Sequence, residues 1–378
     1  MQLAIYLPHF PAEGTPNNGT SVAIAGLAAG LAGNGVRTTV LCEGDARRSL
    51  NGARGYAVEC FEHRAARGRF SLAPGLADYV AGPLARERTL CLLNGMFHPG
   101  MYAMSRCLRR HGVRYVAVPH DPYDPAVFRR NAHLKWPYWY LFERRMLAQA
   151  SAVQVLDARH GGCLRRLGLR TPVIETENGV DSERVPPESH LHWRASGSPV
   201  RLVFLGRLDA YNKGLDVLLE AFGRLPARGE ARLTLQGPDW GDRGALERQA
   251  RRAGIGEAVE LLAPDYARSA PEILAAHDVF CLPSRFEGFG LAALEAMLAA
   301  RVLLVSERAG IARHVEASGC GVAVAPTVHG VREGLDRLLQ RRERWREMGL
   351  AGRRHALERL RWDRIAADLL HAYRALAS

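Results

Sequence analysis

The sequence predicts an α/β protein with two domains, each built around its own parallel β-sheet. Short apolar, β-prone runs alternate with helical patterns along the chain, which is typical of parallel strands joined by right-handed crossovers. The length of 378 residues is too great for one compact core and fits two domains. The segment 182–199 contains three prolines together with glycine and serine, and we interpret it as the linker between the domains.

The first domain is expected to span residues 1–181. Helical patterns predict helices at 20–33 and 136–149. The start of the chain is interpreted as a strand because it lacks the basic region and the apolar core of a signal peptide. Six strands are expected, at 2–7, 36–42, 88–93, 113–118, 152–156 and 172–175.

The second domain is expected to span residues 200–361 and repeats the pattern. A helix is expected at 215–225, and another from near Gly290, because residues 291–300 are all strong helix formers. Residues 362–378 predict one more helix. The strands are expected at 201–205, 231–235, 258–262, 278–282, 302–305 and 322–324.

Two glutamates follow the apolar run 278–282. Glu287 is expected in a glycine-rich turn between strand and helix, and Glu295 about one turn into that helix. Backbone amides and the positive end of the helix favour an anion at this place. Carboxylates would repel an anion, so their presence beside an anion site is explained if they accept hydrogen bonds from hydroxyls of the same ligand. A sugar nucleotide has both features, phosphates in the middle and sugar hydroxyls on either side.

Two cations lie in the loop that follows the predicted strand 201–205. Arg207 offers a planar fork that suits phosphate oxygens, and Lys213 offers a point charge. Gly206 and Gly214 allow the backbone to come close to a ligand. Either cation alone is also explained as a solvated loop charge. Together with the glutamate segment, they favour a diphosphate site.

These motifs resemble those of the GT-B glycosyltransferases, in particular the large retaining family 4 of nucleotide-sugar-dependent enzymes. The resemblance covers nearly the whole chain, and it is specific in 200–325 and loose in 1–170. The matching stretches are Phe-Leu-Gly-Arg-Leu with a later Lys-Gly at 204–214, Glu-x7-Glu at Glu287 and Glu295, Asn-Gly-Val-Asp at 178–181, and the closing segment 362–366 with Tyr373.

The resemblance implies two Rossmann-like domains that face each other across a cleft, with the helix at 362–378 crossing back to the first domain. The second domain would bind the donor nucleotide, and the first would lie on the acceptor side. The catalytic residues implied are His120, Arg207, Lys213 and Glu287. The donor-binding residues implied are Gly19, Gly206, Gly288, Phe289, Gly290, Leu291 and Glu295.

Several positions leave alternatives open. His120 would lie near the transferred sugar, or it is a loop histidine bonded to a backbone carbonyl. Asn94 and His98 could line the acceptor pocket, or Asn94 with the glycine after it is only a turn. The chain also departs from the family at three places. The usual Gly-Gly pair of the N-terminal loop is missing, and only Gly19 matches it. The usual motif of a small residue followed by Gly-x-Pro is replaced by Ala-Arg-Val at 300–302, and Arg313 stands where the family often has an acidic residue.

The activity that the resemblance implies is retaining transfer of a sugar from a UDP- or GDP-sugar to a hydroxyl of a glycan or lipid-linked acceptor, in cell-surface polysaccharide or glycolipid synthesis. No Asp-x-Asp pair is present and two cations face the diphosphate, so no metal or other cofactor is expected. A GT-B-type nucleotide-sugar epimerase, or a non-catalytic protein that binds nucleotide sugars or nucleic acid, stays as an alternative. A nucleic-acid partner is disfavoured because no helix-turn-helix, zinc finger or RNA-binding signature occurs.

Charge and composition bear on location. Residues 1–180 hold 22 of the 51 Lys and Arg residues but only 13 of the 39 Asp and Glu residues, which favours anionic partners. The segment 129–145 mixes cations with aromatics, as an interfacial membrane helix does, or as a helix whose aromatics pack under the sheet. The seven cysteines form no Cys-x-x-Cys pair and are expected to be reduced. We expect a cytoplasmic protein, with contact to the inner face of the membrane left open.

Overall fold

The computed structural model describes residues 1–11, 18–52, 54–63, 68–121, 123, 127–128, 131–181, 185–193, 199–225 and 231–377. The chain forms two compact units. Unit 1 comprises Met1–Gly179 and Trp362–Ser378, and unit 2 comprises Val180–Arg361. Of the segment predicted as a linker, 182–184 and 194–198 lie outside the described residues, and the rest groups with unit 2.

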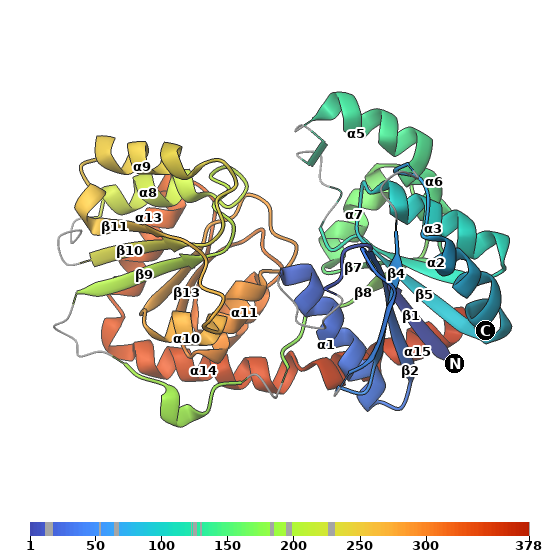
Figure 1. Cartoon of the computed structure of the whole chain (residues 1–378). Coiled ribbons are helices and arrows are strands. Elements are labelled where there is room, and N and C mark those ends of the chain that lie inside the picture. The colour runs from blue at the N-terminus through green and yellow to red at the C-terminus, as the bar shows by residue number, and fades with distance from the viewer. Residues whose placement is uncertain are drawn as a thin grey trace. The chain divides into compact units, whose positions relative to one another are not determined.

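The described part of unit 1 contains an eight-stranded sheet in the order β3-β4-β2-β1-β5-β6-β7-β8 (Figure 1). Every neighbouring pair is parallel except β3 and β4, which are antiparallel. The strands are β1 (Gln2–Tyr6), β2 (Arg37–Gly44), β3 (Arg48–Asn51), β4 (Ala57–Glu62), β5 (Thr89–Asn94), β6 (Arg114–Val118), β7 (Ala152–Val155) and β8 (Val173–Glu175).

Two helices distant in sequence pack together on unit 1: α1 (Gly19–Gly33) and the closing helix α15 (Trp362–Ala377) (Figure 1). They approach closely because Gly26 and Gly30 lack side chains; a Cβ on either would lie within 2.5 Å of an atom of Trp362. This confirms the predicted return of the last helix to the first domain. The other helices are α2 (Pro74–Tyr79), η2 (Val80–Leu84), α3 (Pro99–Arg110), α5 (Ala132–Tyr138), η3 (Trp139–Glu143), α6 (Arg144–Ala148) and α7 (Ala158–Arg166).

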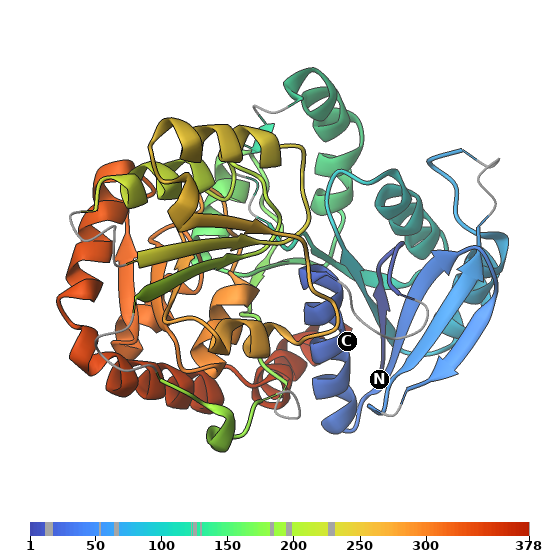
Figure 2. The same ribbon diagram turned by 60° about the vertical axis from the view of Figure 1, so that its left-hand side comes forward.

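The described part of unit 2 contains an all-parallel sheet in the order β11-β10-β9-β12-β13-β14, covered by helices on both faces (Figure 2). Its strands are β9 (Val200–Leu205), β10 (Ala231–Gln236), β11 (Val259–Leu262), β12 (Val279–Leu282), β13 (Val302–Ser306) and β14 (Gly321–Val324). Its helices are η5 (Glu188–His190), α8 (Leu215–Gly223), α9 (Arg243–Arg252), η7 (Gly256–Ala258), α10 (Ala270–Ala275), α11 (Leu291–Leu298), α12 (Ala312–Ser318), α13 (Val328–Leu339), η8 (Arg342–Arg344) and α14 (Trp345–Arg359).

The structure confirms two parallel-sheet domains and corrects two details of the first. The strands β3 and β4 were not predicted, because β3 is exposed at every residue and glutamates interrupt the apolar residues of β4 after every second position. The predicted helix 136–149 is divided into α5, η3 and α6. Pro137 lies inside α5 and has no N–H to donate, which is a recognised cause of such irregularity.

All seven cysteines are free; Cys107 is half-buried and the others are buried. Among the described residues, no helix has the length and apolar character that crossing a membrane would require.

Candidate functional site

The strand order of unit 2 reverses between β9 and β12, and the crevice at such a reversal is where open α/β sheets bind ligands. The loops 206–214 and 283–290 follow these two strands. They lie against each other, because the backbone N–H groups of Arg285 and Phe286 donate to the carbonyl oxygen of Asn212 at 2.9 and 3.2 Å. The loop with the two predicted cations and the loop with Glu287 therefore form one continuous surface.

A glycine makes this approach possible. Gly214 has a φ of 66°, in the left-handed region that favours glycine. A Cβ at this position would lie 2.2 Å from the carbonyl oxygen of Pro283. Any side chain at 214 would therefore push the two loops apart.

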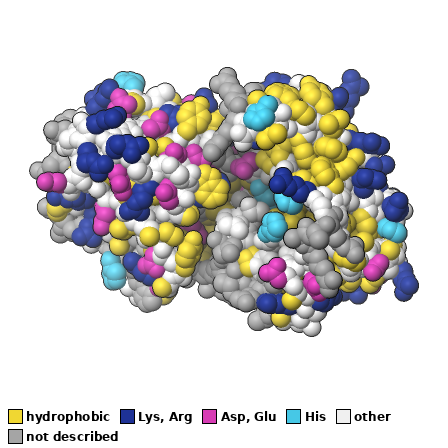
Figure 3. Space-filling view, turned by 45° about the horizontal axis from the view of Figure 1, so that its top comes forward, with side chains coloured by type: hydrophobic (Ala, Val, Ile, Leu, Met, Phe, Trp, Pro, Cys, Tyr) yellow, Lys and Arg dark blue, Asp and Glu magenta, His cyan; other side chains and the backbone are white. Residues whose placement is uncertain are grey.

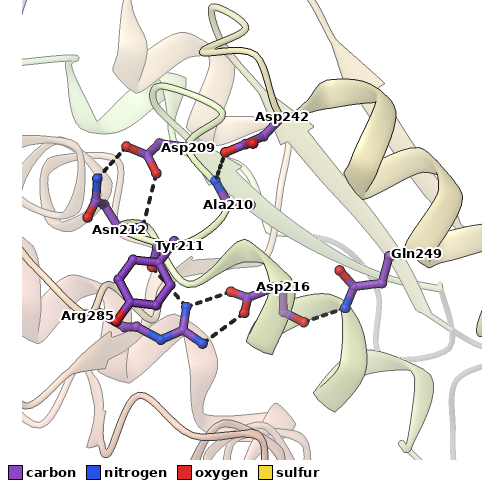
Figure 4. A network of polar contacts seen from close by, with 8 residues as sticks. All are labelled: Asp209, Ala210, Tyr211, Asn212, Asp216, Asp242, Gln249 and Arg285. Atoms are coloured by element: carbon purple, nitrogen blue, oxygen red, sulfur yellow. Dashed lines mark hydrogen bonds and ion pairs between the residues drawn. The ribbon is translucent and has the colours of Figure 1, made fainter. Parts of the chain in front are cut away.

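Arg285, in the second loop, forms hydrogen bonds with the first loop and with α8 (Figure 4). Its guanidinium donates to both carboxylate oxygens of Asp216, at 2.7 and 2.8 Å, and to the carbonyl oxygen of Tyr211 at 2.9 Å. It also lies over the Tyr211 ring, 4.7 Å from the centroid. The hydrogen bonds with Asp216 raise the pKa of Arg285. Nothing in the sequence distinguishes Arg285 from other loop arginines, so the sequence does not predict this role.

The first loop is also fixed internally (Figure 4). The Asp209 carboxylate accepts from the backbone N–H and the side-chain amide of Asn212, at 3.1 and 2.6 Å. Asp242 accepts from the backbone N–H of Ala210 at 2.8 Å. The backbone that carries Lys213 is thus held at three points before any ligand binds.

The predicted site residues Lys213 and Glu287 pair with each other. The Lys213 Nζ donates to Glu287 Oε2 at 2.8 Å, and the Ser284 hydroxyl donates to the same oxygen at 3.2 Å. Both charged side chains are largely buried, with 16% and 14% exposure. An ammonium has three N–H donors, so Lys213 can hold Glu287 and still offer donors to a phosphate. The sequence does not predict this ion pair, because Lys213 and Glu287 belong to two motifs that are far apart in the chain.

The other donor-side residues lie around this pair in different environments. Arg207 is exposed, and its guanidinium lies 4.9 Å from the ring centroid of Trp240; Gly206 precedes it with a φ of 153°. Glu295 is half-buried in the second turn of α11. The remaining predicted residues form the start of that helix: Gly288, Phe289 and Gly290 are buried, and Leu291 is half-buried.

The turn before α11 is rigid. Gly290 has a φ of 105° and directly precedes the first residue of the helix, as the sequence predicts. The Ile311 N–H donates to the Phe289 carbonyl at 2.9 Å, and a Cβ at Gly310 would lie 2.7 Å from the Gly288 carbonyl oxygen. The helix therefore begins at a fixed place next to the Lys213–Glu287 pair.

One departure from the family has a structural explanation. Ala300, which stands where the family has glycine, has a φ of 53°. The buried guanidinium of Arg301 donates to the carbonyl oxygens of Ala299, His192 and His277, and burial lowers its pKa to about 10. Arg301 thus ties the segment before β9 to the core of unit 2.

In unit 1, the structure brings His120 and Asn94 together at the carboxyl ends of the neighbouring strands β6 and β5. The His120 Nε2 lies 2.9 Å from Asn94 Oδ1. The Asn94 amide Nδ2 donates to the carbonyl oxygens of Leu92 and Tyr6, at 3.0 and 3.4 Å, so Oδ1 is the acceptor and His120 Nε2 carries the proton. His120 is therefore bonded to a side chain and not to the backbone carbonyl that was the alternative.

Burial determines the charge of His120. It lowers the pKa of the imidazole to about 4, so the ring is neutral at neutral pH. With Nε2–H donating to Asn94, Nδ1 is left as an acceptor. His120 also has a positive φ of 63°, an uncommon conformation for a residue other than glycine.

His98 and Gly19 lie at helix starts. The His98 Nδ1 accepts from the backbone N–H of Gly100 at 3.1 Å and so caps α3. Burial lowers the pKa of His98, and so does the neighbouring His9, whose ring centroid is 5.6 Å away. Gly19 is the first residue of α1 and is exposed; Asn18 caps that helix by accepting from Ser21 N–H at 2.9 Å. Residues 12–17 of the same loop lie outside the described residues.

The predicted site residues thus fall into two groups, one in each unit. Lys213 is joined to Glu287 in unit 2, and His120 is joined to Asn94 in unit 1. Within the described ranges, no three His, Cys, Asp or Glu side chains gather as they would around a metal ion.

Comparisons with known proteins agree with this arrangement. Residues 190–355 match the family model described as Glycosyl transferases group 1, and residues 17–184 match the model described as Glycosyltransferase Family 4. Together the two models cover most of the chain, and their junction falls inside the segment predicted as a linker.

Two curated relatives are named as a glycosyltransferase and a mannosyltransferase. The D-inositol 3-phosphate glycosyltransferase of Nocardia farcinica is 30% identical over 253 residues, which are 62% of this chain and 54% of that protein. The MMP alpha-(1->4)-mannosyltransferase of Mycolicibacterium hassiacum is 30% identical over 175 residues, 46% of this chain and 42% of that protein. The chain spans about half the length of the curated relatives it matches.

Solved structures share the fold along the whole chain. Sucrose-phosphate synthase of Thermosynechococcus elongatus has a TM-score of 0.76 at 17% identity, with 100% of this chain and 99% of that chain covered. HepE of Anabaena, solved in complex with UDP and glucose, has a TM-score of 0.74 at 17% identity, with 99% and 100% covered. At this identity the likeness shows the fold alone, and it confirms the predicted GT-B class.

Proposed function

The chain belongs to the GT-B glycosyltransferases of group 1 and family 4, and from this premise we propose that it transfers a sugar from a UDP- or GDP-sugar to a hydroxyl of a glycan or lipid-linked acceptor. The observation that carries the proposal is the Lys213–Glu287 pair at the strand-order reversal of unit 2. In the proposed roles, Lys213 is the cation that neutralises the diphosphate, and Glu287 beside it is the carboxylate that binds sugar hydroxyls. We assign the product to cell-surface polysaccharide or glycolipid.

The proposed reaction breaks the bond between the anomeric carbon and the diphosphate oxygen. Negative charge grows on the leaving diphosphate, and Lys213, Arg207 and the amides at the start of α11 stabilise it. The acceptor hydroxyl attacks from the face that the diphosphate leaves, and the leaving phosphate takes its proton, so configuration is retained. The Nδ1 atom of His120 accepts a hydrogen bond from a sugar hydroxyl, so His120 acts as a positioning group.

We propose that the reaction needs no metal. In metal-dependent transferases a divalent cation neutralises the diphosphate, whereas here Lys213 and Arg207 supply two positive charges from one loop. The measurement is sugar transfer in the presence of excess EDTA, and we expect the activity to persist.

Nucleotide binding tests the class of the protein. Relatives named as mannosyltransferases favour a GDP-linked donor, and the neighbour solved with UDP and glucose favours a uridine one. We expect one nucleoside diphosphate at about 100 times its Kd to stabilise the native state by about 2.7 kcal/mol. NAD and an oligonucleotide serve as controls in the same thermal-shift panel. A shift with either control and with no nucleoside diphosphate would contradict the proposal.

Incubation with the donor alone separates transfer from the alternative reaction. A transferase leaves the sugar of the donor unchanged until an acceptor hydroxyl is added. An epimerase produces a new sugar isomer without an acceptor, and chromatography of the nucleotide sugars would show it.

We also propose that unit 1 contacts an anionic bilayer through the segment 132–148. Trp139 packs in the core, but Leu134, Tyr140 and Leu141 are more than 60% exposed. Figure 3 shows hydrophobic side chains gathered on one part of the surface with Lys and Arg side chains at its edge. Exposed apolar side chains beside cations are the composition of an interfacial segment.

A cavity next to these side chains supports an anionic partner. It has a volume of about 620 Å³ and is lined by Tyr140, Arg144, Arg145 and Arg170, together with apolar residues and Thr171. Among the residues that the structure describes, no acidic side chain lines it. Three guanidinium groups around one hollow suit the phosphates of lipid headgroups.

Sedimentation with lipid vesicles tests this contact. We expect the protein to bind vesicles that contain phosphatidylglycerol, not pure phosphatidylcholine vesicles, and to be released by high salt. Changing Arg144 and Arg145 to Gln removes two of the charges, at about 1 kcal/mol each, and should weaken binding. The matched control changes Arg251 and Arg252, exposed on α9 of unit 2, to Gln. Equal loss in both double variants would contradict a specific surface.

A further inference from the structure

A buried carboxylate lies outside the residues discussed so far. Glu143 ends η3 and is fully buried. It forms no salt bridge with any described residue. Buried charged groups of this kind are uncommon, and they require hydrogen bonds that compensate for lost hydration.

Glu143 joins two loops of unit 1. Its Oε1 accepts from the Tyr123 hydroxyl at 2.6 Å and from the backbone N–H of Phe97 at 3.0 Å. Phe97 lies between Asn94 and the helix cap His98, in the loop after β5. Tyr123 lies three residues after His120, in the loop after β6. One oxygen atom thus joins the loop after β5, which contains His98, to the loop after β6, which contains His120; Asn94 is the last residue of β5.

The backbone at both loops is in an uncommon conformation. Phe97 and His120 have φ values of 51° and 63°, and a non-glycine residue in this region costs about 1 kcal/mol or more. Such conformations persist where the surroundings fix them, and they concentrate at functional sites. The Glu143 carboxylate is the group that holds the Phe97 N–H in place.

We propose that Glu143 is a positioning residue for the acceptor side of the reaction: by accepting from Phe97 and Tyr123, it holds the loops of Asn94, His98 and His120 in their working geometry. This rests on the proposed function. The hydrogen bonds of Glu143 go to Phe97 and Tyr123 and not to these three residues, so its effect passes through the backbone of the two loops.

The strength of the hydrogen bonds that Glu143 accepts from Phe97 and Tyr123 depends on whether its carboxyl group is ionised. Burial raises the pKa of Glu143 to about 7, while the hydrogen bonds from Tyr123 and Phe97 oppose that rise. The facing titratable groups are Tyr123 and Tyr138, with Lys135 on the far side over the Phe97 ring at 5.7 Å. Both tyrosines keep their protons at neutral pH because burial raises each pKa. Above about pH 7 the ionised Glu143 makes charge-assisted, stronger hydrogen bonds.

The Phe97 amide resonance reports this contact without reference to activity. Met96-Phe97 is the only Met-Phe pair in the sequence, so carbonyl-¹³C methionine with ¹⁵N phenylalanine selects one amide. We expect its proton to move downfield as pH rises from 6 to 8, with a midpoint near 7, and to stay fixed in Glu143→Gln. A resonance that does not titrate in the wild type, or that titrates equally in the variant, overturns the proposal.

Kinetics test the consequence. Glu143→Ala should lower kcat/KM for the acceptor by about 10- to 100-fold, because small displacements of positioned groups have effects of that size. Glu143→Gln keeps an acceptor oxygen and should retain most activity at pH 7, but lose the rise in kcat/KM between pH 6 and 8. The thermal shift by nucleoside diphosphate should stay unchanged in both.

Tyrosine variants guard against a general folding defect. Tyr123→Phe removes one donor to Glu143 and should lower kcat/KM for the acceptor. Tyr115→Phe is the matched control, because its buried hydroxyl donates at 2.7 Å to the Met146 carbonyl and not to Glu143. Equal effects of the two variants overturn the proposal. If the wild type transfers no sugar from any donor, the proposed function fails, while the Phe97 resonance still decides the Glu143 contact.

Discussion

Replacing Lys213 by alanine is expected to lower kcat about 10²- to 10³-fold, the size of loss seen when one preorganised donor to a developing negative charge is removed. The physical reason is the position of the ammonium, held at 2.8 Å from Glu287 on a loop that hydrogen bonds fix internally. The measurement is steady-state transfer with the donor that the nucleotide panel identifies, with nucleotide affinity measured alongside.

The same change should have a smaller effect on folding. It removes one hydrogen bond between charged groups and leaves the Ser284 hydroxyl on Glu287, so we expect to lose no more than about 3 kcal/mol of stability. Arg344→Ala is the control, since it breaks the exposed ion pair with Glu347 in the same unit and should leave kcat unchanged. Wild-type turnover in Lys213→Ala would remove this residue from the mechanism.

A second variant separates two ways in which Lys213 could act. If it binds the diphosphate directly, Lys213→Ala weakens binding of the nucleoside diphosphate, which has no sugar, and Glu287→Gln does not. If it only orients Glu287, both variants weaken the nucleotide sugar and spare the nucleoside diphosphate. The ammonium has three N–H donors and gives one to Glu287, so the two that remain favour the first outcome.

Apolar runs predict strands that are buried on both faces, and this explains which parts of the fold could be read from the sequence. The strands from β5 to β14 were predicted within a residue or two. Of these, β5, β12 and β13 are buried at every residue, whereas the short strands β8 and β11 are mostly half-buried. The strand β3 is exposed along its length, so no apolar run marks it. The last helix was predicted with nearly its observed bounds, but its packing against α1 came only from the resemblance.

The candidate site shows a similar division. Spacing within one loop placed Arg207 and Lys213 correctly after β9, and Glu287 after β12, because local sequence determines which strand a residue follows. Contacts between loops were not predictable, because they depend on strand order, which no local pattern encodes. The Lys213–Glu287 pair joins residues 74 positions apart, and the Glu143–Phe97 bond joins residues 46 positions apart.

Gly214→Ala is expected to force apart the two donor loops, 206–214 and 283–290. Alanine at a φ of 66° costs about 1 kcal/mol on its own. The added Cβ would also lie 2.2 Å from the Pro283 carbonyl oxygen, and no side-chain rotation relieves a contact with backbone. The loops must separate, so the variant should lose both stability and affinity for the nucleoside diphosphate. Chemical unfolding and nucleotide titration measure the two losses.

Gly254→Ala is the matched control for that experiment, because it isolates the backbone conformation from the contact. Gly254 has a φ of 67°, and a Cβ there would meet no atom within 4 Å. We expect the control to lose about 1 kcal/mol and to bind nucleotide normally. The excess loss in Gly214→Ala then measures the contact with Pro283 alone. Identical unfolding curves for the two variants would mean that the loops 206–214 and 283–290 separate freely, and that the fixed geometry around Lys213 and Glu287 does not exist in solution.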